Sequence, residues 1–168
     1  LIGTTNRAAT MSTPSGWTLL GTRTDGTDLR SWAFTRTAQA GAGGKAVSVT
    51  LDAISKTSLT LLAYSGAGAV TAAASAAEAA TSATQHTAPN VAVAQSGSWV
   101  ISSWVDKTAS GDPGWTLPAG VTLRNTNTGT GSGVVTAVSG DTASVTAGTW
   151  TGRTATAGVA SGKAIAWS

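Results

Sequence analysis

The sequence has no cysteine and few charged residues. It contains 168 residues, of which only 10% are charged, ten basic and seven acidic. Without cysteine, neither a disulfide framework nor a thiolate metal site is possible. No two basic residues are adjacent in the chain, whereas nucleic-acid-binding surfaces gather Lys and Arg into patches or stripes. We therefore expect no nucleic-acid partner.

Long apolar runs are absent, and so are most aromatic residues other than tryptophan. No apolar stretch approaches the roughly 20 residues that a membrane-spanning helix needs, so we expect no membrane insertion. The chain has one Phe and one Tyr against seven Trp. Tryptophan must therefore supply most of the aromatic surface of any core or binding site.

Residues that could form a catalytic constellation are equally scarce. His86 is the only histidine and Glu78 the only glutamate. No G-x-S-x-G nucleophile elbow occurs, and a glycosidase would need two facing carboxyl groups. We therefore expect a protein that is not an enzyme and has no cofactor. We expect His86 to lie in a loop and to bond to the backbone.

Two segments of the chain share the pattern Pro, any residue, Gly, large apolar residue, Thr and Leu. They are Pro14–Leu20 and Pro118–Arg124, and each predicts a turn that leads into a strand. Other short stretches alternate apolar and polar residues between Gly-rich turns, as Leu29–Thr37 does, and Gly140-Asp141 is itself predicted as a turn. Together these features predict an all-β fold, a jelly-roll-like antiparallel β-sandwich of two duplicated Greek-key-like halves.

We expect a single domain over residues 1–168, with halves 1–66 and 89–168 joined by an Ala-rich crossover, 67–88. Within the crossover, Ala72–Ala80 predicts a short helix, because Ala is the best helix former. Ser58–Tyr64 is the most continuously apolar stretch and is expected to be a central strand. The segment ahead of the Pro-Gly pattern is shorter in the first half, so we expect the domain to be truncated at its N-terminus.

The tryptophans are the main candidates for ligand binding, because exposed aromatic rings can stack on sugar rings. Trp99 and Trp104 are five residues apart, so they face opposite sides of one strand. Trp99 shares its face with Val105 and is expected in the core, as are Trp17, Trp32 and Trp167. Trp104, Trp115 and Trp150 are the candidate glycan-binding residues, and burial in the core is the competing interpretation, because large aromatic residues dominate cores and interfaces alike.

Four aspartates are candidates for calcium ligands. Asp25 and Asp28 flank a predicted turn, and Asp106 and Asp112 flank a polar loop. None has the spacing of an EF-hand, and calcium sites built from separate loops leave no sequence pattern. No metal is therefore the main expectation, with calcium as the alternative.

Several stretches of the chain resemble one family of β-sandwich domains. They are Pro14–Gly21, Leu29–Arg36, Val47–Leu51, Ser58–Gly66, His86–Pro89, Gly97–Val100 and Gly162–Ser168. The family occurs in secreted or surface proteins of actinobacteria and in minor tail or fibre proteins of phages that infect them. Its members begin with a further strand ahead of the position of Leu1, which also implies truncation.

The resemblance implies a non-enzymatic structural or adhesion module of a phage virion, in a tail, fibre or capsid-decoration position. Such a module is expected at the virion surface or outside the cell. Its expected partners are other virion proteins or copies of itself, for example in a trimer, and host cell-surface polysaccharide. The alternative is a carbohydrate-binding module of a secreted actinobacterial protein. The resemblance implies no site residues.

Overall fold

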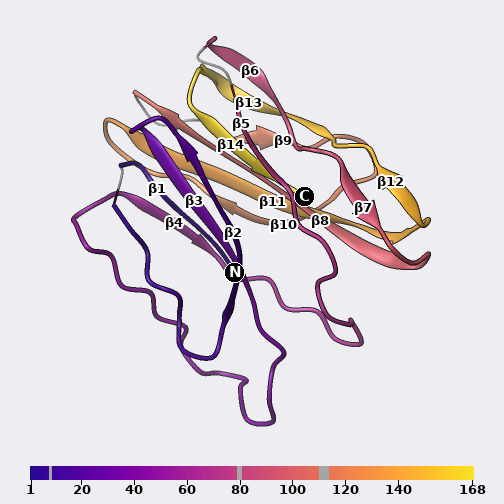
Figure 1. The fold of residues 1–168 in the computed structure, drawn as a ribbon. Helices are drawn as coiled ribbons and strands as arrows, with labels where there is room; N and C mark the ends of the chain where they lie inside the picture. Colours follow the sequence, from indigo (N-terminus) through magenta and orange to yellow (C-terminus); the bar gives the residue numbers. More distant parts are fainter. Residues whose placement is uncertain (8, 79–80, 110–113) are drawn as a thin grey trace.

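The computed structural model describes residues 1–7, 9–78, 81–109 and 114–168. These residues form antiparallel strands and loops, and no helix occurs among them (Figure 1). Accordingly, the described part of the chain contains no helix long and apolar enough to cross a membrane. The all-β fold predicted from the sequence is confirmed.

The first sheet is formed by the N-terminal part of the chain. Its strands lie in the order β2-β3-β1-β4. They are β1 (Ile2–Thr5), β2 (Thr18–Asp25), β3 (Leu29–Thr35) and β4 (Thr57–Thr60). The tight turn between β2 and β3 is closed by a bond from Asp28 N to Asp25 O, with Gly26 at positive φ.

The second sheet contains the two longest strands, and its order is β10-β11-β8-β14-β5. The strands are β5 (Ser75–Ala77), β8 (Ser98–Thr108), β10 (Thr122–Asn127), β11 (Val134–Val145) and β14 (Ala164–Trp167). The predicted turn at Gly140-Asp141 is wrong, because β11 continues through both residues and pairs there with β8 and β10.

The two sheets repeat one strand order. The spatial order β2-β3-β1-β4 of the first sheet corresponds to the order β10-β11-β8-β14 in the second. When the four strands are numbered by their order in the chain, they lie side by side in both sheets as second, third, first and fourth. The Pro-Gly patterns lead into the equivalent strands β2 and β10. The fourth strand returns beside the first, as in a Greek key, but the first strand's other neighbour is the third strand. The jelly-roll connection between the halves stays a prediction.

A third layer covers the far face of the second sheet (Figure 1). Its strands are β6 (Ala83–Thr87), β7 (Val91–Val93), β9 (Trp115–Thr116), β12 (Gly148–Trp150) and β13 (Thr154–Ser161). They form the groups β6-β13-β9 and β12-β7. The second sheet is therefore sandwiched, and β8 and β11 are buried along most of their length.

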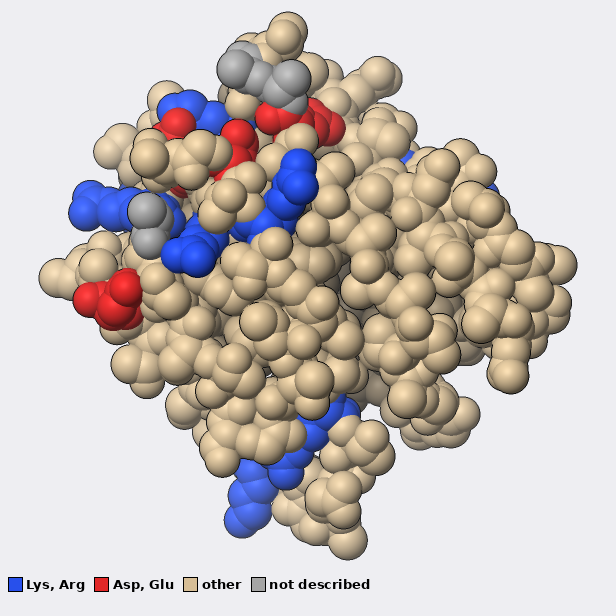
Figure 2. Space-filling model, in the orientation of Figure 1, with Lys and Arg blue, Asp and Glu red and all other residues tan. Residues whose placement is uncertain are grey.

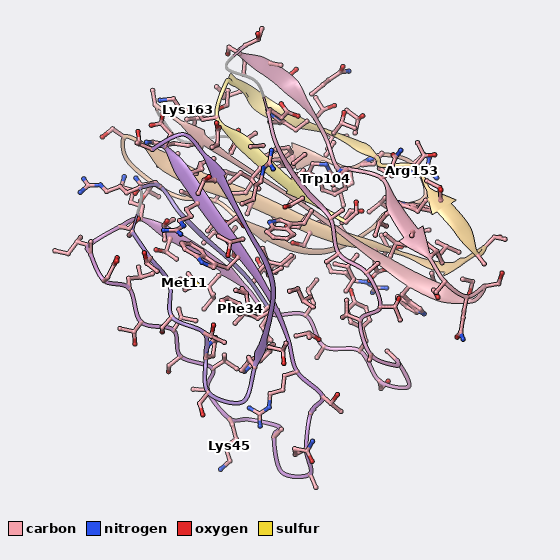
Figure 3. The ribbon with its side chains drawn as sticks, in the orientation of Figure 1. Met11, Phe34, Lys45, Trp104, Arg153 and Lys163 are labelled. Carbon is pink, nitrogen blue, oxygen red and sulfur yellow. The ribbon has the colours of Figure 1, made fainter. Side chains whose placement is uncertain are left out.

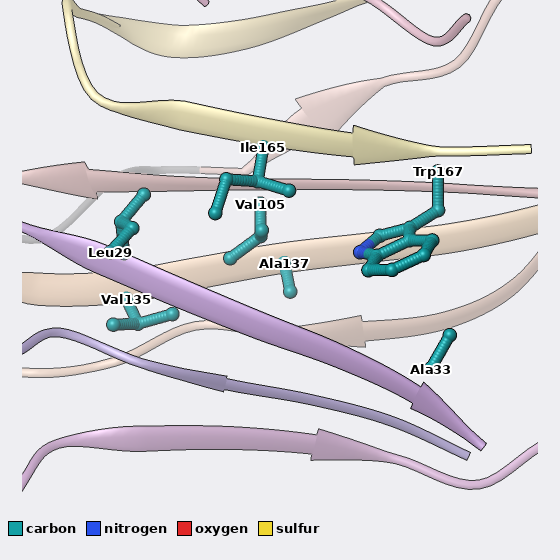
Figure 4. Close-up of a cluster of buried hydrophobic side chains, with 7 residues drawn as sticks. All are labelled: Leu29, Ala33, Val105, Val135, Ala137, Ile165 and Trp167. Carbon is teal, nitrogen blue, oxygen red and sulfur yellow. The ribbon is translucent and has the colours of Figure 1, made fainter. Parts of the chain in front are cut away.

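Apolar clusters fill the spaces on both sides of the second sheet. Between the first and second sheets, Leu29 of β3 packs with Val105 and Ile165 (Figure 4). On the opposite face, Trp104 and other residues of the second sheet pack against the third layer. The central sheet therefore contributes side chains to two separate cores.

The outer face of the first sheet is covered by loops. Met11 and Phe34 lie in a further buried cluster with Trp32, against which Leu51 from the loop before β4 also packs (Figure 3). Met11 and Leu51 form an isolated antiparallel bridge that ties the two loops together. These loops therefore bury the outer face of the first sheet in place of a further layer of strands.

Two predictions for the middle of the chain are wrong. Within the expected helix Ala72–Ala80, residues Ser75–Ala77 form β5, because the edge of β14 offers backbone partners that outweigh the helix propensity of Ala. The expected central strand Ser58–Tyr64 is shorter, and β4 lies at the edge of its sheet. The crossover 67–88 supplies β5 and β6 to two different layers.

Candidate functional site

Trp104, one of the three predicted glycan-binding residues, lies in the core. Its side chain is 0% exposed and packs with Val138 and Ala155 between the second sheet and the third layer (Figure 3). A sugar can stack only on an exposed ring, so the prediction for Trp104 is wrong. Sequence reasoning treated this face of β8 as open, whereas the third layer covers it.

Trp115 and Trp150 are partly buried, and both rings already have a protein partner. The ring of Trp115 lies 5.3 Å from the ring of His86, centroid to centroid. The guanidinium of Arg153 lies over the ring of Trp150, 4.5 Å from its centroid. Glycan binding by these two residues stays a prediction.

Trp99 is the exposed tryptophan of this region, although the sequence predicted it in the core. Its residue is 47% exposed. It shares its face of β8 with Val105, as predicted, but it lies at the start of the strand. The strands of the first sheet have 4 to 8 residues, whereas β8 and β11 have 11 and 12, so the first sheet leaves this end uncovered. Trp32 and Trp167 are buried as predicted, and Trp17 is partly buried.

Tyr64 and Arg124 lie against the exposed ring of Trp99. The ring of Tyr64 meets it edge-on, with centroids 5.4 Å apart and an interplanar angle of 61°. The guanidinium carbon of Arg124 lies 5.8 Å from the Trp99 ring centroid, within the range of a cation–π contact. We call Tyr64, Trp99, Arg124 and the carboxylate beneath them, Asp141, the Trp99 site.

Asp141 holds the other polar groups of the Trp99 site in place. Its side chain is 1% exposed, whereas that of Arg124 is 40% exposed. Arg124 Nε donates to Asp141 Oδ2 over 2.6 Å, and Nη2 donates to Oδ1 over 3.1 Å. Tyr64 Oη also donates to Oδ2, over 2.7 Å. A buried carboxylate with charge-assisted, two-point bonding fixes the planes of its partners.

A β-bulge directs Arg124 toward this carboxylate. The register between β10 and β11 shifts between Leu123 and Asn125, which leaves Arg124 as the extra residue, and bulges re-aim side chains in this way. The register between β2 and β3 shifts at the equivalent position, Leu20, in the first sheet. Leu20 packs against the cluster between the first and second sheets. The same bulge therefore holds an apolar residue in the first half and a charged one in the second.

Polar side chains bring the end of β4 next to β10 and so help to position Tyr64, which follows β4 in the chain. Asn127 Nδ2 donates to Ser58 Oγ over 3.1 Å and to Thr60 Oγ1 over 3.0 Å. Thr60 Oγ1 in turn donates to Asn125 Oδ1 over 3.1 Å. These bonds join the edges of the first and second sheets beside the Trp99 site.

The electrostatics of the Trp99 site keep both Tyr64 and Arg124 protonated. Burial, and then the hydrogen bond to Asp141, raise the pKa of the Tyr64 phenol above its ordinary range. The hydrogen bond to Asp141 is the main cause that raises the pKa of Arg124 further. The site therefore presents a fixed cation, a phenol that points inward and an open indole.

Three of the calcium candidates, Asp25, Asp28 and Asp106, lie toward the opposite end of β8, where most charged residues of the visible face gather (Figure 2). Both carboxylate oxygens of Asp28 bind lysines, Lys107 Nζ at 2.7 Å and Lys163 Nζ at 2.9 Å, and these bonds lower its pKa. Burial is the main cause that raises the pKa of Asp25. A cation at Asp28 would have to displace two ammonium groups.

The other two calcium candidates do not complete a site. Asp106 is fully buried in β8, and Asp112 lies outside the described residues. Across residues 1–7, 9–78, 81–109 and 114–168, no group of three or more His, Cys, Asp or Glu side chains could hold a metal ion.

Glu78 and His86 form a pair that the sequence did not indicate. His86 lies on β6, not in the predicted loop, and is 1% exposed. Its Nδ1 lies 2.6 Å from Glu78 Oε2, and Thr87 N donates to Glu78 Oε1 over 2.9 Å. A catalytic histidine must present its other nitrogen to a nucleophile, but Nε2 is buried and has no hydrogen-bond partner among the described residues. The pair therefore ties β6 to the segment that follows β5.

Sequence reasoning missed Tyr64, Arg124 and Asp141 as site residues. Alignment of the two Pro-Gly patterns would have indicated Arg124, because it replaces an apolar residue at the last position of the pattern. Comparisons with models of protein families, with curated proteins and with solved structures find no match for this chain. The functional proposal therefore depends on the site geometry and on the sequence features described above.

Proposed function

We propose that the protein is a non-enzymatic adhesion module that binds glycans through the Trp99 site. The observation that carries the proposal is the half-exposed ring of Trp99 beside Tyr64 and Arg124, which Asp141 holds in place. Trp, Tyr and Arg are the residue types that dominate binding energy at interfaces. An aromatic ring combines a flat apolar face for sugar C–H groups with neighbouring polar groups for hydroxyls.

The buried charge of Asp141 supports a binding role over a purely structural one. Burying an ion pair costs desolvation energy that the pair itself often does not recover, so such pairs are weak contributors to stability. In the first half, the equivalent bulge holds the apolar Leu20. The same backbone therefore forms without a charge, and the Arg124–Asp141 pair is better explained by what it presents at the surface.

The setting that we propose is the virion of a phage that infects actinobacteria, in a tail, fibre or capsid-decoration protein. The sequence resemblance, the low content of charged residues and the lack of a catalytic constellation support this setting. The second candidate is a carbohydrate-binding module of a secreted actinobacterial protein. The Trp99 site suits either setting, since both kinds of protein bind glycans without catalysing a reaction on them.

A glycan array tests the shared part of the proposal. The wild-type chain should bind a subset of bacterial surface glycans, and Trp99→Ala should lose that binding. Ile54→Ala is the matched control, because Ile54 is 92% exposed and apolar and belongs neither to the Trp99 site nor to the bulge that directs Arg124. Equal binding by wild type and Trp99→Ala would exclude this site as the contact.

Light scattering on the purified chain separates the two settings. A virion structural module should form a trimer or a larger symmetric assembly, because tail and capsid positions are built from repeated copies. A carbohydrate-binding module should be a monomer. A stable monomer at high concentration would therefore favour the second candidate.

A further inference from the structure

We infer that the Trp99 site recognises an acidic glycan, whose carboxylate pairs with the outward edge of the Arg124 guanidinium. This inference rests on the proposed function, because it assumes that the site binds glycans at all. It adds the chemical class of the ligand, and the inventory of donors and acceptors in the site carries it.

The site has unused donors. Arg124 uses Nε and one N–H of Nη2 on Asp141, and Nη1 donates to no residue in the described part of the chain. A guanidinium carries five N–H donors in a planar fork, so its outer edge remains available for a ligand. With the side chain 40% exposed, that edge faces solvent beside the Trp99 ring.

The one side chain of the site that only accepts hydrogen bonds, Asp141, is not open to a ligand. Both oxygens of Asp141 accept bonds from Arg124 and Tyr64, and the side chain is almost completely buried. Tyr64 Oη points inward to the same carboxylate. A neutral sugar presents hydroxyls that must donate as well as accept, whereas a carboxylate only accepts. The free donors of the site are the N–H groups on the outer edge of Arg124, and they fit a carboxylate, with which arginine makes strong two-point bonds.

The nearest cluster of acidic residues is too far away to repel such a ligand. Asp28 bonds to Lys107, which lies eight positions from Trp99 along β8. At about 3.3 Å per residue, this separation is roughly 25 Å, several Debye lengths at physiological salt. The carboxylate within the site, Asp141, is already neutralised by Arg124.

The two halves of the chain provide an internal comparison. Thr18 pairs with Thr35 in the first sheet, and Thr122 pairs with Asp141 in the second. Leu20 and Thr35 therefore stand where Arg124 and Asp141 stand. The first half forms the bulge without either charge, so both charges can be replaced together by residues that this backbone already accommodates.

The test measures affinity for acidic glycans and for their carboxyl-reduced counterparts. The panel contains oligosaccharides of uronic acids, sialic acid and pyruvylated sugars, each beside the same oligosaccharide with its carboxyl group reduced to an alcohol. Calorimetric titration should show binding to at least one acid, and the reduced form should bind about tenfold more weakly, as expected for one lost charge-assisted bond. Raising the salt from about 0.05 M to about 0.5 M should weaken binding of the acid.

The double variant Arg124→Leu with Asp141→Thr is the matched control. It reproduces the pair in the first half and leaves no unpaired buried charge, so the chain should still fold, which circular dichroism can check. Discrimination between the acid and its reduced form should disappear, while the Trp99 ring remains. If the variant does not fold, Arg124→Lys keeps the charge but loses the two-point fork, and it should reduce the discrimination.

The outcomes separate this inference from the proposed function. Equal affinity for acids and reduced forms, with loss of both on Trp99→Ala, would overturn the acidic ligand and leave glycan binding intact. Binding of neutral sugars alone would likewise overturn the acidic ligand and leave glycan binding intact. Absence of binding to every glycan on the panel and on the array would overturn both proposals together.

Discussion

At the scale of single residues, exposure of an aromatic ring depends on what covers its end of the strand. Trp99 and Trp104 lie on opposite faces of β8, as their spacing predicts. Trp104 is covered by the third layer, whereas the shorter first sheet leaves Trp99 exposed. Spacing determines the face of a strand but carries no information on the length of its neighbours.

Replacement of the two tryptophans should therefore have opposite consequences. Trp104→Ala removes a fully buried ring and should lower the free energy of unfolding by about 3 to 5 kcal/mol, because a cavity remains. Trp99→Ala should lower it by about 1 kcal/mol or less, as surface substitutions do. Urea denaturation of both variants tests this. A larger loss for Trp99→Ala would show that the ring belongs to the core.

The ionisation of Tyr64 can be followed alone, because the chain has one tyrosine. Burial and the bond to Asp141 raise its pKa above the ordinary value of 10.0. A group with a raised pKa in the folded state stabilises fully below its unfolded pKa, and this contribution is lost as pH rises through the folded pKa. The tyrosinate absorbance of the folded protein should therefore appear only well above pH 10.0.

The unfolded chain is the control for this titration. In concentrated urea, Tyr64 should ionise near its ordinary pKa, and Asp141→Asn should move the folded value toward it. If the folded protein and the unfolded chain titrate at the same pH, Tyr64 does not bond to Asp141 in solution.

At the scale of single elements, β11 was the hardest strand to predict. Gly140-Asp141 has the composition of a turn, yet the strand continues through it because β8 and β10 supply backbone partners on both sides. Gly140 is required by close packing. A Cβ there would lie 2.6 Å from Val121 Cγ1 and 2.7 Å from Thr122 O.

Gly140→Ala should therefore destabilise the protein and disturb the adjacent bulge. We expect a loss of about 1 to 3 kcal/mol, the usual cost of overpacking. Gly43→Ala is the matched control, because its Cβ would meet nothing within 4 Å, and it should change stability by about 0.5 kcal/mol or less. Thermal unfolding of both variants gives the comparison, and equal midpoints would contradict the close approach.

At the scale of the whole molecule, one hydrogen bond links residues far apart in the chain. Trp167 Nε1 of β14 donates to Ser31 Oγ of β3 over 2.9 Å, from the second sheet to the first. Trp167→Phe keeps an aromatic ring but removes this donor and some volume, so we expect a loss of about 2 kcal/mol. Because both sheets share this core, fluorescence and circular dichroism should still report one coincident transition. Two separate transitions would show that the sheets unfold independently.

The all-β class and the repeat of the Pro-Gly pattern were predictable, because turn residues and alternation are local signals. The third layer was not, since β6 and β9 have only 5 and 2 residues and show no clear alternation, and a strand pattern does not indicate the layer that a strand joins. The Trp99 site was also not predictable, because Tyr64 and Asp141 meet through sheet packing across 77 positions of sequence. His86 and Glu78 were each noticed, but their pairing depends on how β6 and the segment after β5 meet.

The paired bulges at Leu20 and Arg124 bear on how such a chain can evolve. One copy keeps the apolar residue that packs the main core, so mutations in the other copy do not remove that packing. Position 124 can therefore vary among descendants while the architecture is inherited unchanged. If the Trp99 site binds glycans as proposed, one or two substitutions at this bulge would change which glycan it prefers without changing the fold.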